Sequence, residues 1–198
     1  MKKQNKKLKK EYRKGEKVFD KIYPFLMILY FPLLLLPNSI NKMFLALSRG
    51  IPGFIGVGIR YVLVKRLAKK CGRNVAIFPS VYFIEIENLV IGSHISIREA
   101  CYIDGDNLEI GDNVMISHSS SIVTGAHYYD ENIPMRDLLE DRHVKIGNNV
   151  WIGAGARILG SVNIGDNVII SANSVVSKSI KSNVVVGGVP ARVLKPIS

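Results

Sequence analysis

Four histidines are the side chains of this sequence that exchange protons most readily near neutral pH: His94, His118, His127 and His143. Imidazole has an ordinary pKa near 6.5, so it can take a proton from a hydroxyl and make that oxygen a nucleophile. His127 stands apart because it ends a regular run of six-residue units and directly precedes a long charged segment. His118 projects from the preceding face and is a second candidate for the same cleft, while His94 and His143 are expected at the surface. A lone histidine at a corner is also compatible with simple solvation, so position alone leaves the role of His127 open.

The elements that position His127 are predicted by a repeat with a period of six. From residue 146 to 181 the chain reads IGNNVW, IGAGAR, ILGSVN, IGDNVI, ISANSV, VSKSIK. The first and fifth columns hold small or apolar residues, and Gly, Asp or Asn often follows the first. Such a unit is a short strand followed by a corner, and it buries its apolar side only by stacking on its neighbours. The period therefore predicts a parallel β-helix.

The same pattern extends upstream to residue 71 and predicts five coils over residues 71–181. The inward first column is expected to hold Cys71, Ile77, Phe83, Ile91, Ile97, Ile103, Ile110, Ile116, Ile122, Ile146, Ile152, Ile158, Ile164, Ile170 and Val176. Two extra residues after Phe83 and one after Ile103 must bulge at corners, because an insertion inside a strand would turn the inward column outward. The segment 128–145 interrupts the repeat and is expected to protrude as a functional loop. Residues 182–198 form a C-terminal segment.

Composition sets further limits. A hydrophobic fraction of 47% and a charged fraction of 22% exclude a disordered chain. The two cysteines, Cys71 and Cys101, fall in inward columns, so we expect buried free thiols, although a disulfide is possible. So few cysteines are typical of a reducing compartment.

The N-terminal 70 residues do not follow the repeat. Residues 1–21 are a basic tail with nine Lys and one Arg against three acids, which is +7 of the total net charge of +11. Residues 22–70 are apolar or amphipathic, and the run 22–37 carries no charge but is shorter than the roughly 20 residues that span a bilayer. We expect an interfacial hairpin or helix pair there, and a helix over residues 59–70, with Arg60 on a basic face, that closes the first coil. Helices packed on the β-helix or between subunits are the alternative, and the apolar run favours an anionic membrane surface over nucleic acid.

Three motifs carry a resemblance to a known family. TGAHYYD, IGNNVWIGAGA and SVVSKSIKSNVVVGGVPARV resemble the hexapeptide-repeat sugar and polysaccharide O-acetyltransferases, over residues 71–194. The resemblance implies that the β-helix is left-handed, so the expected fold is all-β: a left-handed parallel β-helix of about five coils, with the N-terminal helical, membrane-proximal extension predicted above. It also implies acetyl-CoA as the acyl donor, and a homotrimer whose active sites lie between neighbouring subunits, with the loop 128–145 as the covering arm.

The resemblance also assigns site residues. His127 matches the general base, whose other ring nitrogen Asp130 or a backbone carbonyl would orient. The positions that match coenzyme A contacts are Ala154, Ala172, Ser177, Lys178 and Arg192. On the acceptor side, Asp106 matches a family contact across a one-residue gap, and Arg98 stands where galactoside-type members carry Asn. The outward-facing Trp151 either lines the pocket or covers an edge.

The expected function is an acetyl-CoA-dependent O-acetyltransferase that modifies a sugar of a surface polysaccharide or its lipid-linked precursor. We expect the protein in the cytoplasm, peripheral at the inner face of the cell membrane. We expect no nucleic-acid partner. An N-acetyltransferase of an amino sugar, a xenobiotic acetyltransferase and a non-catalytic hexapeptide scaffold are the alternatives. A zinc enzyme of the γ-carbonic anhydrase type is disfavoured, because His118 and His127 are nine residues apart and no H-x4-H is present. We therefore expect no metal.

Overall fold

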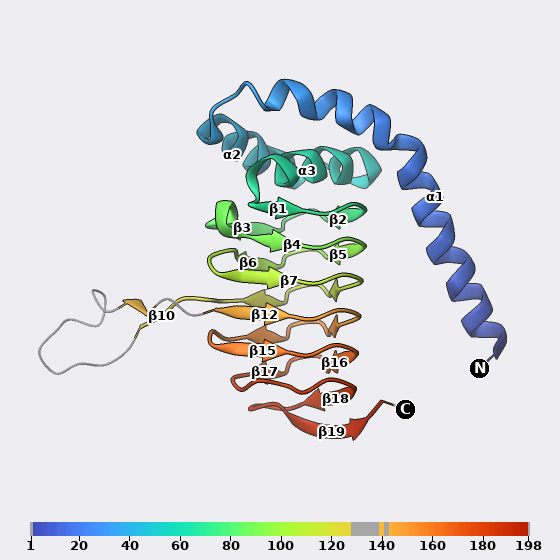
Figure 1. The fold of residues 1–198 in the computed structure, drawn as a ribbon, viewed down its shortest axis with the longest axis vertical. Coiled ribbons are helices and arrows are strands. Elements are labelled where there is room, and N and C mark those ends of the chain that lie inside the picture. The colour runs from blue at the N-terminus through green and yellow to red at the C-terminus, as the bar shows by residue number, and fades with distance from the viewer. Residues whose placement is uncertain (1, 128–138, 141–142, 198) are drawn as a thin grey trace, which may run out of the picture.

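The computed structural model describes the backbone of residues 2–127, 139–140 and 143–197, and the side chains of residues 17–125 and 143–197. A three-sided solenoid carries a helical cap at its N-terminal end (Figure 1). The cap consists of α1 (Lys2–Leu33), α2 (Asn38–Leu47), the 3-10 helix η1 (Ser48–Gly50) and α3 (Gly53–Leu67). The solenoid follows from β1 onward, and its coils stack in the left-handed parallel β-helix that the resemblance implies.

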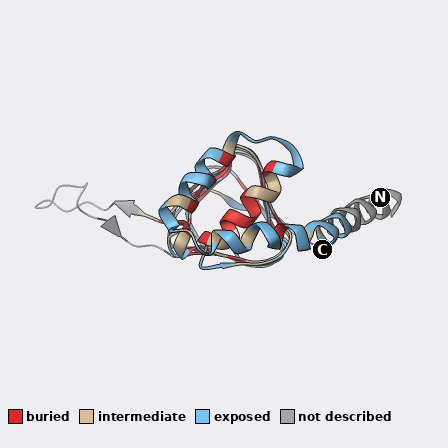
Figure 2. Cartoon of the chain, turned by 90° about the horizontal axis from the view of Figure 1, so that it is seen from above, coloured by how far each residue is buried: buried red, intermediate tan, exposed pale blue. Residues whose placement is uncertain are grey.

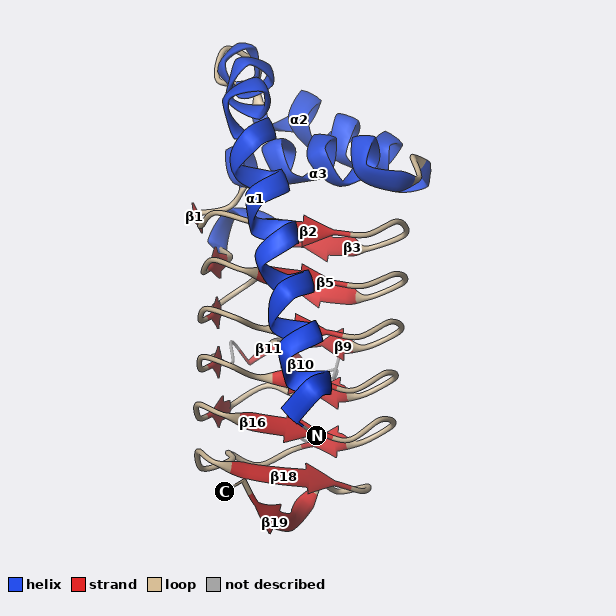
Figure 3. Cartoon of the chain, turned by 90° about the vertical axis from the view of Figure 1, so that its right-hand side faces the viewer, coloured by secondary structure: helices blue, strands red, loops and turns tan. Residues whose placement is uncertain are grey.

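Three sheets form the sides of the solenoid (Figure 3). Sheet 1 contains β1 (Lys70–Cys71), β4 (Val90–Ile91), β7 (Leu108–Ile110), β12 (Val144–Ile146) and β15 (Val162–Ile164). Sheet 2 contains β2 (Val75–Ile77), β5 (Ile95–Ile97), β8 (Met115–Ile116), β13 (Trp151–Ile152), β16 (Val168–Ile170), β18 (Val184–Gly187) and β19 (Arg192–Pro196). Sheet 3 contains β3 (Tyr82–Ile84), β6 (Tyr102–Asp104), β9 (Ser121–Ile122), β14 (Arg157–Ile158) and β17 (Val175–Val176). Each coil contributes one strand to each sheet, and the expected five coils are confirmed.

The predicted first column fills the interior. From Ile91 to Val176 each of its members exposes 3% of its surface or less. Only Cys71 and Phe83, in the first coil, are partly exposed. Parallel pairing keeps the column in register, with Ile146 between Ile110 and Ile164. Both cysteines are free thiols, and burial raises the pKa of Cys71 to about 12.

The corners absorb the irregularities, as predicted. The two extra residues after Phe83 lie in the turn that contains η2 (Ile86–Asn88), and the single extra residue lies between β6 and β7. Both turns connect sheet 3 to sheet 1, and we call this line of corners edge 3–1. The long segment between β9 and β12 leaves from the same edge. Edge 2–3 is the line of corners between sheets 2 and 3, at residues 78–81, 98–101, 117–120, 153–156 and 171–174.

The helical cap closes the first coil, as predicted, but its arrangement differs from the prediction. One helix, α1, crosses the expected boundary after residue 21, so the run 22–37 is the end of a long helix and a turn rather than a hairpin or helix pair of its own. Seen from above, buried residues of the cap lie over the interior of the solenoid, and its outer side is exposed (Figure 2).

Arg60 corrects the prediction of a basic face on α3. Its side chain is 0% exposed and lies between the cap and the first coil. Its Nε donates to the carbonyl of Ile77 at 2.8 Å, and its Nη1 donates to the carbonyls of Ser48 at 2.6 Å and Ile51 at 2.9 Å. Burial lowers the pKa of the guanidinium. The three carbonyls replace part of the water around this buried cation, while its Nη2 is buried without a hydrogen-bond partner among the described residues.

Candidate active site

His127 lies where the chain leaves the solenoid at edge 3–1. Two residues, Ala126 and His127, form β10, which pairs antiparallel with β11 (Leu139–Glu140), with His127 opposite Leu139. The preceding Val123 is still part of the solenoid, because its N–H donates to the carbonyl of Ile158 at 3.0 Å. The side chain of His127, and Asp130 as a whole, lie outside the described residues.

Asp104 holds the backbone that leads to His127. Its Oδ2 accepts from the N–H groups of Thr124 at 3.3 Å and Gly125 at 3.4 Å, and its Oδ1 accepts from the N–H of Asp106 at 3.3 Å. These contacts join the end of β6 to the coil below it, at Gly125, the residue directly before β10. Asp104 is not among the residues predicted from the sequence. The available signal was an acidic residue one coil above the TGAH motif, at the corner that carries an insertion.

Edge 3–1 also holds Asp106. Its Oδ1 accepts from the Nδ2 of Asn88 in η2 at 2.8 Å. The insertion after β3, the insertion after β6 and the segment that begins with β10 thus follow one another down a single edge (Figure 1). Because these irregular turns all lie on edge 3–1, the surface of this edge differs from the regular corners elsewhere on the solenoid. Binding sites are commonly formed by such irregular loops on a regular scaffold.

Edge 2–3 holds the other predicted acceptor residues. The guanidinium of Arg98 lies 4.1 Å from the ring centroid of Phe78 and pairs with Glu99 at 3.1 Å. Trp151 is 46% exposed on sheet 2 beside this edge, and its Nε1 donates to the Oγ of Ser117 at 3.0 Å. His118 is exposed at the same edge, so it does not share the edge of His127 within one chain.

The predicted donor residues are divided between the two edges. Ala154 lies above Ala172 at edge 2–3, where the N–H of Asn173 donates to the carbonyl of Ala154 at 2.8 Å. Arg192 pairs with Gly187 at the C-terminal end of the same edge. Ser177 and Lys178 instead follow β17 and lie exposed at edge 3–1, on the side of His127.

The small residues at edge 2–3 are required by close contact between coils. A Cβ added at Gly153 would lie 2.6 Å from the backbone nitrogen of Ala172 and 2.7 Å from the carbonyl oxygen of Ile170. Gly153, next to Ala154, therefore has no room for a side chain. Within the described residues no cluster of three His, Cys, Asp or Glu side chains could hold a metal ion.

The chain is similar to known acetyltransferases. The family of bacterial transferase hexapeptide repeats (six repeats) matches residues 143–178. The chain is 35% identical to the galactoside O-acetyltransferase of Escherichia coli K12 over 140 residues, 70% of this chain and 69% of that protein. It is 34% identical to a putative lipopolysaccharide-biosynthesis O-acetyltransferase of the same organism over 142 residues, 71% of this chain and 66% of that protein. A solved galactoside acetyltransferase in complex with coenzyme A superposes with a TM-score of 0.74 at 32% identity, covering 81% of this chain and 80% of that one.

Proposed function

The chain belongs to the hexapeptide-repeat sugar O-acetyltransferase family, and from this premise we propose that it transfers the acetyl group of acetyl-CoA to a sugar hydroxyl of a surface polysaccharide or of its lipid-linked precursor. The observation that carries the proposal is the placement of His127 on edge 3–1, where, among the described residues of the coils, the departures from the repeat are found. Similarity to a lipopolysaccharide-biosynthesis enzyme supports the choice of a cell-surface glycan as acceptor.

His127 acts in this proposal as the general base of a direct transfer. Its imidazole takes the proton of the acceptor hydroxyl while that oxygen attacks the thioester carbonyl carbon. The C–O bond forms, the C–S bond breaks, and coenzyme A leaves as a thiol after taking up a proton. A hydroxyl is a poor nucleophile at neutral pH, so proton removal of this kind contributes on the order of 10²–10⁴-fold.

Two groups of residues bind the donor and acceptor in this proposal. Ala154 and Ala172 leave space for the pantetheine arm, Ser177 supplies a hydroxyl beside it, and the cations of Lys178 and Arg192 meet the phosphates. For the acceptor, Asp106 lies on the edge of His127, and carboxylates readily accept hydrogen bonds from sugar hydroxyls. Arg98 and Trp151 lie on the other edge, where a cation and an exposed indole suit a sugar with an acidic substituent.

The division of these residues over two edges supports a homotrimer. Sheet 3 separates edge 3–1 from edge 2–3 within one chain, so a single subunit presents only part of the proposed site at each edge. In a closed ring, edge 3–1 of one subunit can face edge 2–3 of its neighbour. Each of the three sites is then completed by two subunits, and the segment 128–145 is the candidate arm between them.

The helical cap supports attachment to the inner face of the cell membrane. Between Asp20 and Glu85 the chain contains nine Lys and Arg residues and no Asp or Glu. Large apolar side chains on the cap are nonetheless exposed, among them Phe25, Phe31 and Leu35. This combination suits a peripheral contact with an anionic bilayer. Within the described residues, none of the helices is long and apolar enough to cross a bilayer.

The test is release of free thiol from acetyl-CoA by the full-length protein with a panel of sugar acceptors. We expect acceptor-dependent turnover in the wild type and a loss of at least about 10²-fold in His127→Ala, with coenzyme A still bound. His94→Asn removes an imidazole from a corner between sheets 1 and 2, away from both site edges, at a φ of 60° that Asn tolerates, and as the matched control it should keep wild-type turnover. Equal turnover in His127→Ala and wild type would remove His127 as the base. Failure of the wild type to bind coenzyme A would favour a scaffold.

A further inference from the structure

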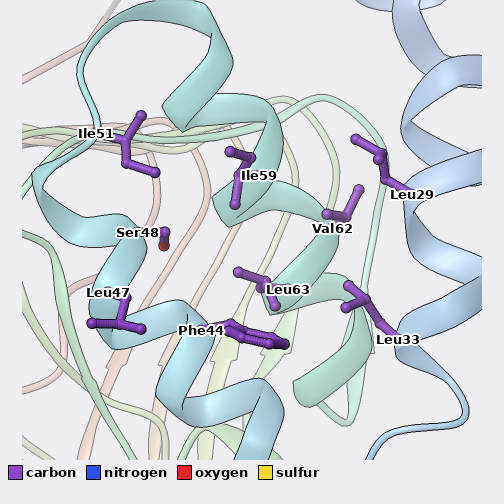
Figure 4. A pocket seen from close by; sticks show the side chains of 9 residues that line it. All are labelled: Leu29, Leu33, Phe44, Leu47, Ser48, Ile51, Ile59, Val62 and Leu63. Carbon is purple, nitrogen blue, oxygen red and sulfur yellow. The ribbon is translucent and has the colours of Figure 1, made fainter.

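The helical cap contains an apolar groove that the proposed chemistry does not use (Figure 4). It has a volume of about 320 Å³ and lies among α1, α2, η1 and α3. The residues that line it are Leu29, Leu33, Phe44, Leu47, Ser48, Ile51, Ile59, Val62 and Leu63. Leu47 is 70% exposed at its rim. The lining offers almost no polar group that could orient a polar ligand, so the groove fits a hydrocarbon chain.

The walls of the groove are fixed by polar contacts behind them. The Nδ2 of Asn41 donates to the carbonyls of Leu33 and Leu36, both at 3.1 Å, and the Nε of Arg66 donates to the carbonyl of Leu33 at 3.1 Å. These donors satisfy the last carbonyl of α1 and one carbonyl of the turn that follows it, and they hold this end of α1 against α2 and α3. A groove that is already formed costs a ligand little ordering free energy.

The charge around the groove selects the type of amphiphile. Residues 21–84 contain no Asp or Glu, and they include every residue that lines the groove together with the cations Lys42, Arg49 and Lys65. An anionic group attached to the hydrocarbon chain would therefore meet cations and no carboxylate from residues 21–84. A phosphate or diphosphate between a lipid and a saccharide has this character.

The groove is also connected to the edge that carries His127. Lys42 of α2 forms an ion pair with Glu87 of η2, which places α2 above edge 3–1. Asn88 of η2 in turn contacts Asp106, one coil further down. His127 lies on the third coil, and because coils stack at about 4.8 Å, it is roughly 10 Å below η2 along the solenoid axis. One or two sugar residues span such a distance.

We propose that the groove holds the hydrocarbon chain of a lipid-linked acceptor, whose anionic linkage lies at the cations of the cap and whose saccharide follows edge 3–1 toward His127. This inference rests on the proposed O-acetyltransferase function and specifies its acceptor as an amphiphile. The cap is then an acceptor site as well as a membrane contact.

The experiment compares octyl β-galactoside with methyl β-galactoside, below the critical micelle concentration of the former. Binding is measured by calorimetry and turnover by thiol release, with the full-length protein. We expect wild type to bind the octyl compound at least about tenfold more tightly, since burial of one methylene contributes roughly fourfold. Leu47→Glu, which puts a carboxylate at the groove, should abolish this preference. Phe54→Glu, the same charge on a side chain that is 88% exposed but does not line the groove, should retain it.

Each outcome decides the question. Equal binding of the two galactosides by wild type, or an unchanged preference in Leu47→Glu, overturns the proposal even where both compounds are acetylated. If Leu47→Glu and Phe54→Glu lose the preference for the octyl compound equally, the octyl group contacts the whole apolar side of the cap, as it would in a bilayer. That result also overturns the proposal that the groove is the binding site. Binding of the octyl compound through Leu47 without acetylation of either galactoside supports the groove and counts against the proposed function.

Discussion

Asp104 shows how a single carboxylate can organise a site that it does not enter. It occupies the last position of β6, and its two oxygens accept three backbone N–H groups, two of them from the residues that precede β10. A charged acceptor forms stronger hydrogen bonds with backbone N–H groups than a neutral one does. Asp104 is therefore a positioning residue for the segment that carries His127.

The substitution Asp104→Asn tests this role. An amide has one acceptor oxygen and one NH₂ group. In Asp104→Asn the NH₂ group would therefore replace one of the two carboxylate oxygens and face a backbone N–H, which is also a donor. Loss of hydrogen bonds to a charged group costs about 1.5–3 kcal/mol, and we expect kcat to fall roughly 10- to 100-fold with little change in the KM for acetyl-CoA.

Asp112→Asn is the matched control for that change. The Oδ1 of Asp112 accepts from the N–H of Ser93 at 2.7 Å, in a corner between sheets 1 and 2 and away from both site edges. A similar loss of thermal stability in both variants, with a loss of kcat in Asp104→Asn only, is the expected pattern. A parallel fall of kcat in both would reduce Asp104 to a structural residue.

At the scale of the element, the six-residue repeat predicted the solenoid because each of its columns has one physical environment. Ile152 and Ile170 point inward, and Asn149 and Asn167 take left-handed corners with φ of 54° and 55°. Residues that depend on distant partners escaped the prediction. A charged side chain such as Arg60 is expected at the surface, and its burial is explained by carbonyls that converge on it from β2 and from η1 with its C-cap.

Close stacking of the coils gives a prediction at Gly153. An added methyl group there would meet backbone atoms of the next coil, which cannot rotate away as a side chain could. Overpacking of this type costs about 1–3 kcal/mol, so Gly153→Ala should lower the midpoint of urea unfolding and weaken acetyl-CoA binding beside Ala154. Gly50→Ala is the control, because its added methyl group would have no atom within 4 Å. Equal midpoints for the two variants would contradict the close contact seen at edge 2–3.

At the scale of the whole molecule, the sequence could assign individual residues to a donor or acceptor site but could not say that they lie on different sides of sheet 3. The hexads fix only which residues point inward. Ala172 and Lys178 are six residues apart and fall on successive corners, so a short separation along the chain becomes a full side of the solenoid. In the proposed homotrimer, two neighbouring subunits therefore complete each site.

Mixed trimers test that conclusion. His127→Ala damages edge 3–1, and Ala172→Trp blocks the donor surface of edge 2–3, so each variant alone should be inactive. When the two are unfolded, mixed in equal amounts and refolded together, about one interface in four pairs an intact edge 3–1 with an intact edge 2–3, since heterologous contacts in a ring are directional. We therefore expect about a quarter of wild-type thiol release from the mixture. If each active site lay within one subunit, no mixture of the two variants could restore activity, because every subunit would carry one of the two lesions.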